Sequence, residues 1–333
     1  MSATHARPPA EPSADDVAAT VIIPSFNRAA HLAKALRALA RQRPVPGGFE
    51  VIVVDDGGDP PLDERSLAAD SGGACRVLRT ANGGPAAARN LAARHARGRI
   101  LAFTDDDCEP DPDWLAGLVR RHDSSAAPLV VGGRTVNRLS SNPFAATSQN
   151  LITIGYAHYN RDPERARFFA SNNLSIPRRE FAQLGGFDER FRTAEDRDLC
   201  DRWLHAGRTM TYAPECVIHH AHAMGLAGFW RQHVAYGRGA YRFHAEHRRR
   251  DPDHRIVQWP YYRTLFASLL PPRGVHATPA LAFALGVAQV ANLLGFLRER
   301  STPRPEFDDG RPLRAGDDFE ASPRRRRTPG EAG

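Results

Sequence analysis

Cysteine is scarce in this sequence of 333 residues, which contains only Cys75, Cys108, Cys200 and Cys216. The four are scattered and show no close pairing, so neither a zinc knuckle nor a disulfide framework is indicated. This usage fits a reducing compartment, and we expect a cytoplasmic protein, acting at the inner face of the cell membrane if it binds a membrane at all.

The N-terminal segment lacks the apolar core of a signal peptide. Its first sixteen residues are rich in Ala, Pro, Ser and Asp. This composition favours a disordered leader, which we assign to residues 1–17.

Two nucleotide-binding fingerprints are also missing. The absence of G-x-G-x-x-G disfavours a dinucleotide-binding fold, and the absence of G-x-x-x-x-G-K-[ST] excludes a P-loop. No recognised nucleic-acid-binding module is present, so we expect no nucleic-acid partner.

Apolar runs alternate with helical patterns in the first third of the chain. The runs at 19–23, 49–54, 76–78 and 99–103 predict buried strands. Strands and helices that alternate at this spacing predict an α/β fold, with a mainly parallel sheet flanked by helices. The segment 170–177 is predicted to be an edge strand or a turn.

Polar residues follow several of these strands. Asp55 and Asp56 end the second, Asn82 and Gly83 lie in the turn after the third, and Asp105 follows the fourth. Ligands of open α/β sheets bind outside the carboxyl ends of the strands. We therefore expect these residues to line one crevice, where Asp56 could accept from a base or ribose and the glycine turn could donate N–H groups to phosphate.

Three consecutive aspartates, Asp105, Asp106 and Asp107, end the fourth strand. Along an extended backbone, residues two apart point the same way, so Asp105 and Asp107 are expected to converge. Two such carboxylates suit Mg²⁺ or Mn²⁺. An acidic loop that caps the next helix is the alternative.

A second acidic group, Glu195, Asp196 and Asp198, opens a predicted helix. Capping explains one or two of these acids, and a carboxylate at such a helix start is also well placed as a general base. His219, His220 and His222 follow a later strand, and one of them, His220 in the metal assignment, is a candidate ligand.

The C-terminal third combines Arg with aromatic and apolar residues. A predicted helix at 228–247 interleaves the two and suits a membrane surface or a lipid diphosphate acceptor, although a plain cover helix is equally compatible. The segment 279–297 approaches the length of a membrane span, and an in-plane or buried helix fits it as well. The net charge is +7, with late clusters at 248–250 and 324–327 that suit anionic partners, the last of them in a solvated tail.

Six strings, in this order and spacing, resemble the family 2 glycosyltransferases with the GT-A fold. They are VIIPSFNR at 21–28, VIVVDDG at 51–57, NGGPAAARN at 82–90, FTDDDCEPDPDWL at 103–115, GGFDERF at 185–191 and AEDRDLCDR at 194–202. The resemblance covers roughly residues 20–222. It implies a GT-A catalytic domain at 18–225. Beyond the matched region, composition favours a helical extension at 226–298 that could associate with a membrane, and a disordered tail at 299–333.

The resemblance also implies the roles of individual residues. The nucleotide-sugar-binding residues it implies, with the neighbours assigned above, are Pro24, Ser25, Asn27, Arg28, Asp55, Asp56, Asn82, Gly83, Arg89, Asp105 and Asp106. Asp105 and Asp107 match the DxD motif that holds a divalent cation on the donor diphosphate, with Asp106 and Asp107 as the other register. Asp196, with Glu195 beside it, matches the catalytic base. The implied reaction is inverting transfer from a nucleotide-diphosphate sugar to a glycan or a lipid-linked acceptor.

Departures from the family pattern limit what is implied. Gly57, Gly58 and Asp59 stand where the family often has Gly-Ser/Thr, so hydroxyl contacts there are lost or moved. No Q-x-x-R-W is present, which favours transfer of single sugars over polymerisation. A non-catalytic nucleotide-sugar-binding protein is the main alternative. A sugar nucleotidyltransferase would need a Gly-rich basic N-terminal loop, which 24–28 does not supply.

Overall fold

The computed structural model describes residues 17–73, 75–139, 141–221, 224–253, 259–267 and 279–302, apart from the side chain of Phe266. The expected leader up to residue 16, most of the expected tail, the cluster at 324–327 and the candidate His222 lie outside the described residues.

Eight strands form one sheet, in the order β3-β2-β1-β4-β7-β6-β8-β5. The strands are β1 (Ala19–Ser25), β2 (Phe49–Asp56), β3 (Cys75–Thr80), β4 (Ile100–Phe103), β5 (Cys108–Pro110), β6 (Leu129–Asn137), β7 (Leu174–Pro177) and β8 (Thr209–His220). The first four pair in parallel, as do β6 and β8, while β7 runs antiparallel to both its neighbours. The prediction of a mainly parallel α/β sheet is confirmed.

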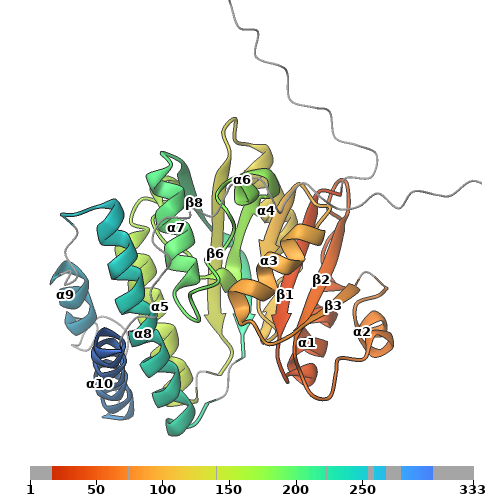
Figure 1. Ribbon diagram of the computed structural model, residues 1–333. Coiled ribbons are helices and arrows are strands. Elements are labelled where there is room, and N and C mark those ends of the chain that lie inside the picture. The colour runs from red at the N-terminus through yellow and green to blue at the C-terminus, as the bar shows by residue number, and fades with distance from the viewer. Residues whose placement is uncertain are drawn as a thin grey trace, which may run out of the picture.

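Helices cover both faces of this sheet (Figure 1). They are α1 (Ala29–Leu39), α2 (Glu64–Asp70), α3 (Pro85–His95), α4 (Trp114–Asp123), α5 (Pro143–Tyr159), α6 (Arg178–Gln183), α7 (Glu195–His205), α8 (Leu226–Arg250), α9 (Trp259–Ala267) and α10 (Pro279–Ser301), with short 3-10 turns at Pro163–Arg165 and Ser171–Asn173.

Alternation along the strands divides the core into two layers. Val21 and Ile23 of β1 pack with Leu32 of α1 and with α4, whereas Ile22 faces α3, α6 and α7 on the other side. Because successive strand residues point to opposite faces, a fully apolar run such as β1 is buried on both.

Of the edge strand or turn predicted at 170–177, a turn forms only at Ser171–Asn173, and the prediction of an edge strand is wrong. Strand β7 lies inside the sheet between β4 and β6, and Leu174, Ser175 and Ile176 are buried. The polarity of Ser175 misled the prediction, because its hydroxyl is satisfied internally, 2.9 Å from Nε2 of His122. Burial of a polar group is tolerated when it is hydrogen-bonded.

The C-terminal helices α8 and α10 lie side by side at one end of the sheet, beyond α5 and α7 (Figure 1). A small third core, in which Phe229 packs with Ala284 and Ala288, joins them to α5. The carboxyl ends of β1, β2 and β4 remain outside this packing and carry the polar residues described next.

Candidate active site

The aspartate triplet follows β4 in a turn rather than in extended backbone. The N–H of Cys108 donates to the carbonyl of Asp105 at 3.2 Å, which closes this turn. The extended backbone from which the convergence of Asp105 and Asp107 was expected is therefore absent, because the alternation of side chains holds only along a strand.

Two arginines divide the three carboxylates between them. Nη2 of Arg89 lies 2.7 Å from Asp105, whereas Nη1 of Arg28 lies 2.8 Å from Asp107 and 3.4 Å from Asp106. Asp106 also accepts from the hydroxyl of Ser25 at 2.8 Å. By direct contact, Asp106 and Asp107 thus share Arg28 on the β1 side, whereas Asp105 pairs with Arg89.

Asp107 lies in the group best suited to a metal among the described residues. One ligand atom each of Asp107, Cys108 and His220 lies within 4.8 Å of the others. Nε2 of His220 is 3.2 Å from Oδ1 of Asp107. The structure therefore brings together two of the three predicted metal ligands, Asp107 and His220, and leaves Asp105 with Arg89.

The electrostatics of this group favour a hard cation over a thiolate site. Burial raises the pKa of the Cys108 thiol well above its ordinary value. Burial opposes the charged form of His220, but the hydrogen bond and charge of Asp107 outweigh it and raise the pKa of the imidazole. Burial also raises the pKa of Asp106 to about 6, against the opposing charge of Arg28. A divalent cation favours the charged form of a neighbouring carboxylate in the same way as Arg28 does.

The residues after β1 and β2 are held by internal hydrogen bonds. Asn27, at a φ of 57°, accepts at Oδ1 from the N–H of Asp59, and Pro24 lies within β1. Asp55 is bound by Nη1 of Arg79 and by the N–H of Gly58, both at 2.8 Å.

Asp56 accepts from the N–H groups of Gly83 and Gly84, at 2.8 and 2.9 Å, at the start of α3. These are the donors that the sequence suggested for phosphate, so here they cap a carboxylate instead. Asn82 precedes them and is exposed.

Arg89 connects the aspartate turn to the second acidic group. Its Nη1 lies 2.8 Å from Glu195 at the first turn of α7, and the arginine is almost fully buried. Asp196, the next residue, accepts at 2.8 Å from the N–H of Arg197 and at 3.3 Å from that of Ser171. Burial, followed by the charge of Glu195, raises the pKa of Asp196 to about 7. A carboxylate of this pKa has a proton affinity matched to general-base work near neutrality.

Helix α8 passes next to Asp196 and contributes residues that the sequence did not single out for this site. The hydroxyl of Thr193, three residues before Asp196, donates to the carbonyl of Ala235 at 2.8 Å. This bond fixes α8 next to the start of α7. The next residue, Tyr236, is 44% exposed, and its hydroxyl accepts from Gln232 at 2.8 Å. Its pKa is raised, first by the protein atoms around the hydroxyl and then by the charge of Asp196. Only the aromatic pattern of 228–247 hinted at this residue.

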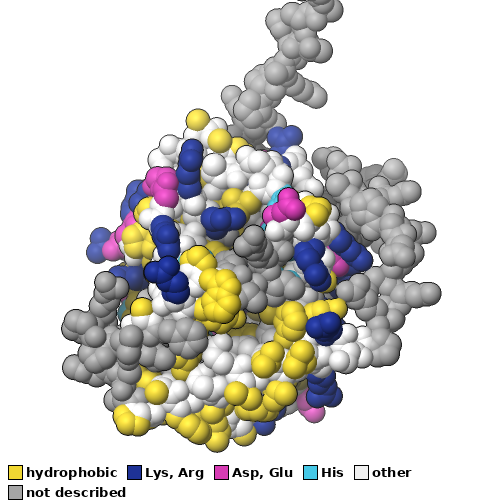
Figure 2. Space-filling view, turned by 90° about the vertical axis from the view of Figure 1, so that its left-hand side faces the viewer, with side chains coloured by type: hydrophobic (Ala, Val, Ile, Leu, Met, Phe, Trp, Pro, Cys, Tyr) yellow, Lys and Arg dark blue, Asp and Glu magenta, His cyan; other side chains and the backbone are white. Residues whose placement is uncertain are grey.

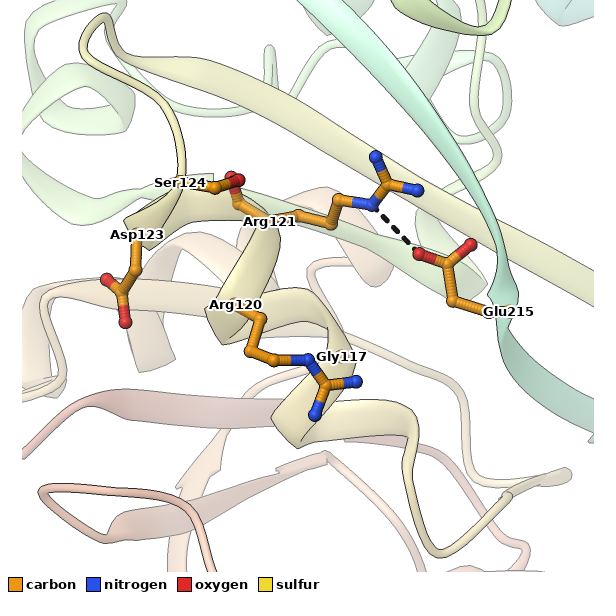
Figure 3. A pocket seen from close by; sticks show the side chains of 6 residues that line it. All are labelled: Gly117, Arg120, Arg121, Asp123, Ser124 and Glu215. Atoms are coloured by element: carbon orange, nitrogen blue, oxygen red, sulfur yellow. Dashed lines mark hydrogen bonds and ion pairs between the residues drawn. The ribbon is translucent and has the colours of Figure 1, made fainter.

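A shallow pocket of about 510 Å³ lies elsewhere, between α4 and β8 (Figure 3). In it, Arg121 points toward Glu215, with Nε 2.8 Å from the carboxylate. Its lining includes none of the candidate residues above, so it is not assigned to the site.

The fold matches solved glycosyltransferase structures. A mannosyltransferase from Pyrobaculum calidifontis, solved with GDP-Man and Mn²⁺, superposes with a TM-score of 0.55 and 22% identity, covering 84% of this chain and 76% of that one. With its mixed, mainly parallel sheet, this protein has the GT-A fold of nucleotide-sugar transferases, as predicted.

The sequence comparisons give the family. The model of glycosyl transferase family 2 matches residues 20–185. A pre-mycofactocin glycosyltransferase of Mycobacterium tuberculosis is 31% identical over 243 residues, which cover 71% of this chain and 49% of that protein. A validoxylamine A glucosyltransferase of Streptomyces hygroscopicus is 29% identical over 226 residues, covering 59% and 50%. The chain belongs to glycosyltransferase family 2, and it spans about half the length of these relatives.

Proposed function

We propose that this protein transfers a sugar from a nucleotide-diphosphate donor to an acceptor hydroxyl, with inversion at the anomeric carbon and the assistance of Mg²⁺ or Mn²⁺. The observation that carries the proposal is the bridge made by Arg89. It holds Asp105, on the donor side, and Glu195, beside the base candidate Asp196, within 2.8 Å of one guanidinium. Donor and base groups are thereby fixed relative to each other, as a displacement in one step requires.

The donor would bind along the ends of β1, β2 and β4. The proposed nucleotide-sugar-binding residues are Pro24, Ser25, Asn27, Arg28, Asp55, Asp56, Asn82, Gly83, Arg89, Asp105 and Asp106. Among them Arg28 is the group best suited to the diphosphate, because it is half exposed and its guanidinium can exchange a carboxylate for phosphate oxygens. Asp56 would have to serve the nucleoside through a lone pair that Gly83 and Gly84 do not use.

Asp107 and His220 would hold the cation, and the chemistry of these donors fits one. The contact of Asp107 with Arg28 shows that this carboxylate already binds a positive group. An imidazole ligand favours Mn²⁺ over Mg²⁺, and the Pyrobaculum neighbour was solved with Mn²⁺. When bound, the cation would supply charge stabilisation for the departing diphosphate.

Asp196 would act as the base. Its carboxylate takes the proton of the acceptor hydroxyl, and the acceptor oxygen forms a bond to the anomeric carbon. The bond from that carbon to the diphosphate oxygen breaks, and the electron pair leaves with the nucleoside diphosphate. Because attack and departure occur on opposite faces, the configuration inverts.

The acceptor would lie on the α8 side, where Tyr236 offers an exposed ring next to Asp196. We propose a glycan or a lipid-linked acceptor, reached at the cytoplasmic face of the membrane through a peripheral contact. Interleaved aromatic and arginine side chains along α8 support this choice.

Release of nucleoside diphosphate from UDP-, GDP- and dTDP-sugars in the presence of Mn²⁺ tests the proposal. We expect one donor to be turned over and Asp107→Ala to abolish turnover. Asp111→Ala is the matched control. Asp111 lies 2.8 Å from Nε2 of His219, a pairing similar to that of Asp107 with His220, but Asp111 is outside the proposed site. Donor binding without release under all conditions, acceptors included, would instead favour the non-catalytic alternative.

A further inference from the structure

Helix α10 exposes an apolar stripe between Phe283 and Leu297. Phe283, Val290, Leu293, Leu294 and Leu297 are each between 44% and 61% exposed. Their spacing of three, four and seven residues places them on one face of the helix. At 1.5 Å per residue, the stripe from Phe283 to Leu297 spans about 21 Å of the helix. This stripe is too long and continuous to be the scattered exposure common on protein surfaces.

The opposite face of α10 is packed tightly against α8. A Cβ on Gly237 would lie 2.0 Å from the carbonyl oxygen of Asn292, and one on Gly295 would lie 2.1 Å from that of Val234. The backbones therefore touch at two points. Glu299, almost fully buried, closes the contact by binding two arginines of α8 at 2.7 and 2.6 Å.

This packing determines how α10 can meet a membrane. By length and composition α10 could cross a bilayer, and it is the one helix of the described residues that could. To cross, it would have to leave α8 and strip Glu299 of Arg238 and Arg242, or carry the arginines of α8 into the hydrocarbon. Both are unfavourable by several kcal/mol per charge. Lying in the plane of the surface requires neither.

Helix α8 in turn is held against α7, the helix that carries Asp196. Arg250, near its C-terminus, lies 2.8 Å from Asp198 and 2.7 Å from Asp201, both on α7. Near its middle it is held by the hydroxyl of Thr193. The stripe is therefore fixed relative to Asp196, which lies on the same helix as Asp198.

We infer that the α10 stripe docks in the plane of an anionic lipid bilayer and so holds the acceptor side of the site at the membrane surface. The charges around the stripe select this occupant. Arg298 and Arg300 are exposed at its end, while Glu299, the only acid of α10, faces inward. A second copy would bring like charges together, whereas anionic headgroups attract them.

Helices α8 and α9, at the same end of the molecule as α10, also carry exposed indole rings. Trp259 of α9 is 71% exposed and Trp230 of α8 is 37% exposed, and indole rings favour the interface between headgroup and hydrocarbon. Figure 2, which views this end of the molecule, shows hydrophobic side chains gathered on its lower half, with Lys and Arg side chains above and beside them. This inference rests on the peripheral membrane contact proposed above and assigns that contact to α10. Its test uses no transfer assay, so either proposal can fail alone.

Co-sedimentation of the full chain with vesicles tests the inference. We expect binding to phosphatidylcholine vesicles that contain phosphatidylglycerol, weaker binding to phosphatidylcholine alone, and release of bound protein by alkaline carbonate. Val290→Glu with Leu294→Glu should weaken binding by about tenfold for each side chain. Arg298→Gln with Arg300→Gln should weaken binding to the anionic vesicles by about fivefold each.

Ala40→Glu is the control for added charge, since Ala40 is exposed at the end of α1, at the other end of the molecule. It should bind as the unchanged chain does. Circular dichroism and thermal unfolding of each variant establish that it is folded. Absence of vesicle binding, or binding that the Val290/Leu294 variant retains, would overturn the inference. A dimer in solution that this variant dissociates would assign the stripe to a second copy, and retention through carbonate extraction would overturn the in-plane arrangement.

Discussion

Replacing Asp196 with Asn should remove transfer while making the folded protein more stable at high pH. Burial and the charge of Glu195 raise the pKa of Asp196 from 3.8 to about 7. Because the folded-state pKa is raised, the ionised carboxylate destabilises the fold. This penalty is fully present above about pH 7, shrinks as the pH falls toward 3.8 and is absent below it.

The size of the effect follows from the same values. The interval from 3.8 to about 7, at about 1.36 kcal/mol per pH unit, corresponds to a penalty of about 4 kcal/mol. Water reaches the partly exposed carboxylate, so we expect about half of this, ~2 kcal/mol. The amide of Asn can accept from only one of the two N–H groups that Asp196 binds, and losing the longer bond, 3.3 Å to Ser171, costs about 1 kcal/mol. The net gain at pH 8 is about 1 kcal/mol, or ~3 °C in Tm.

Thermal unfolding at pH 8 and at pH 5 measures this difference, and nucleoside diphosphate release measures turnover. At pH 5 about 0.8 kcal/mol of the penalty remains, which nearly balances the loss of about 1 kcal/mol from the bond to Ser171, so the two proteins should unfold at nearly the same temperature. In the unchanged enzyme, kcat/KM should rise with pH and level off above about 7, as the base loses its proton. A stability difference that does not depend on pH would refute the electrostatic reasoning, and full turnover by the variant would move the base elsewhere, with Glu195 as the next candidate.

Three further outcomes are expected. Glu195→Gln should destabilise the fold by about 2 kcal/mol in urea unfolding, because it leaves the buried guanidinium of Arg89 short of one charge partner; unchanged stability would mean that the bridge is not needed. His220→Ala should weaken Mn²⁺ binding, measured by calorimetry, by at least about tenfold, with His219→Ala as a control that binds normally. Gly237→Ala should lower stability by about 1–3 kcal/mol, since its Cβ would meet the backbone of α10 at 2.0 Å. Gly286→Ala, which would meet nothing within 4 Å, should not do so.

Most of the sheet could be predicted from local sequence pattern. The prediction failed where a polar residue is buried. Continuous apolar runs such as β1 and β2 identify buried parallel strands, because both of their faces are covered. The sequence of β7 contains Ser175 and therefore predicts a half-exposed strand. The hydroxyl of Ser175 is instead hydrogen-bonded inside the protein. The histidines at 219 and 220 were expected to follow a later strand, but β8 runs on to include both, and this extension brings the imidazole of His220 beside Asp107. No local signal marks that extension.

The candidate site was predictable as a set of positions but not as a set of contacts. The ends of parallel strands gather polar residues at one edge, so Asp55, Asp56 and Asp105 could be expected near one another. The choice of partner is decided between residues far apart in the sequence, since Arg89 and Glu195 are 106 positions apart. The arginine side chain is long enough to reach several carboxylates, and only packing around α3 and α7 determines that it binds Asp105 and Glu195.

The aspartates are divided between two arginines, so Asp105 and Asp107 differ in how easily a divalent cation can bind them. Asp105 shares Arg89 with Glu195, and because that guanidinium is buried, the departure of either acid would leave it short of one charge partner. Asp107 shares Arg28, which is half exposed and can move into water at little cost. A divalent cation therefore competes more easily for Asp107 than for Asp105, and an Arg28 released by that competition is left next to the place proposed for the diphosphate. On this reasoning Asp105 maintains the link between the donor and base sides of the site, and Asp107 is the carboxylate that remains exchangeable.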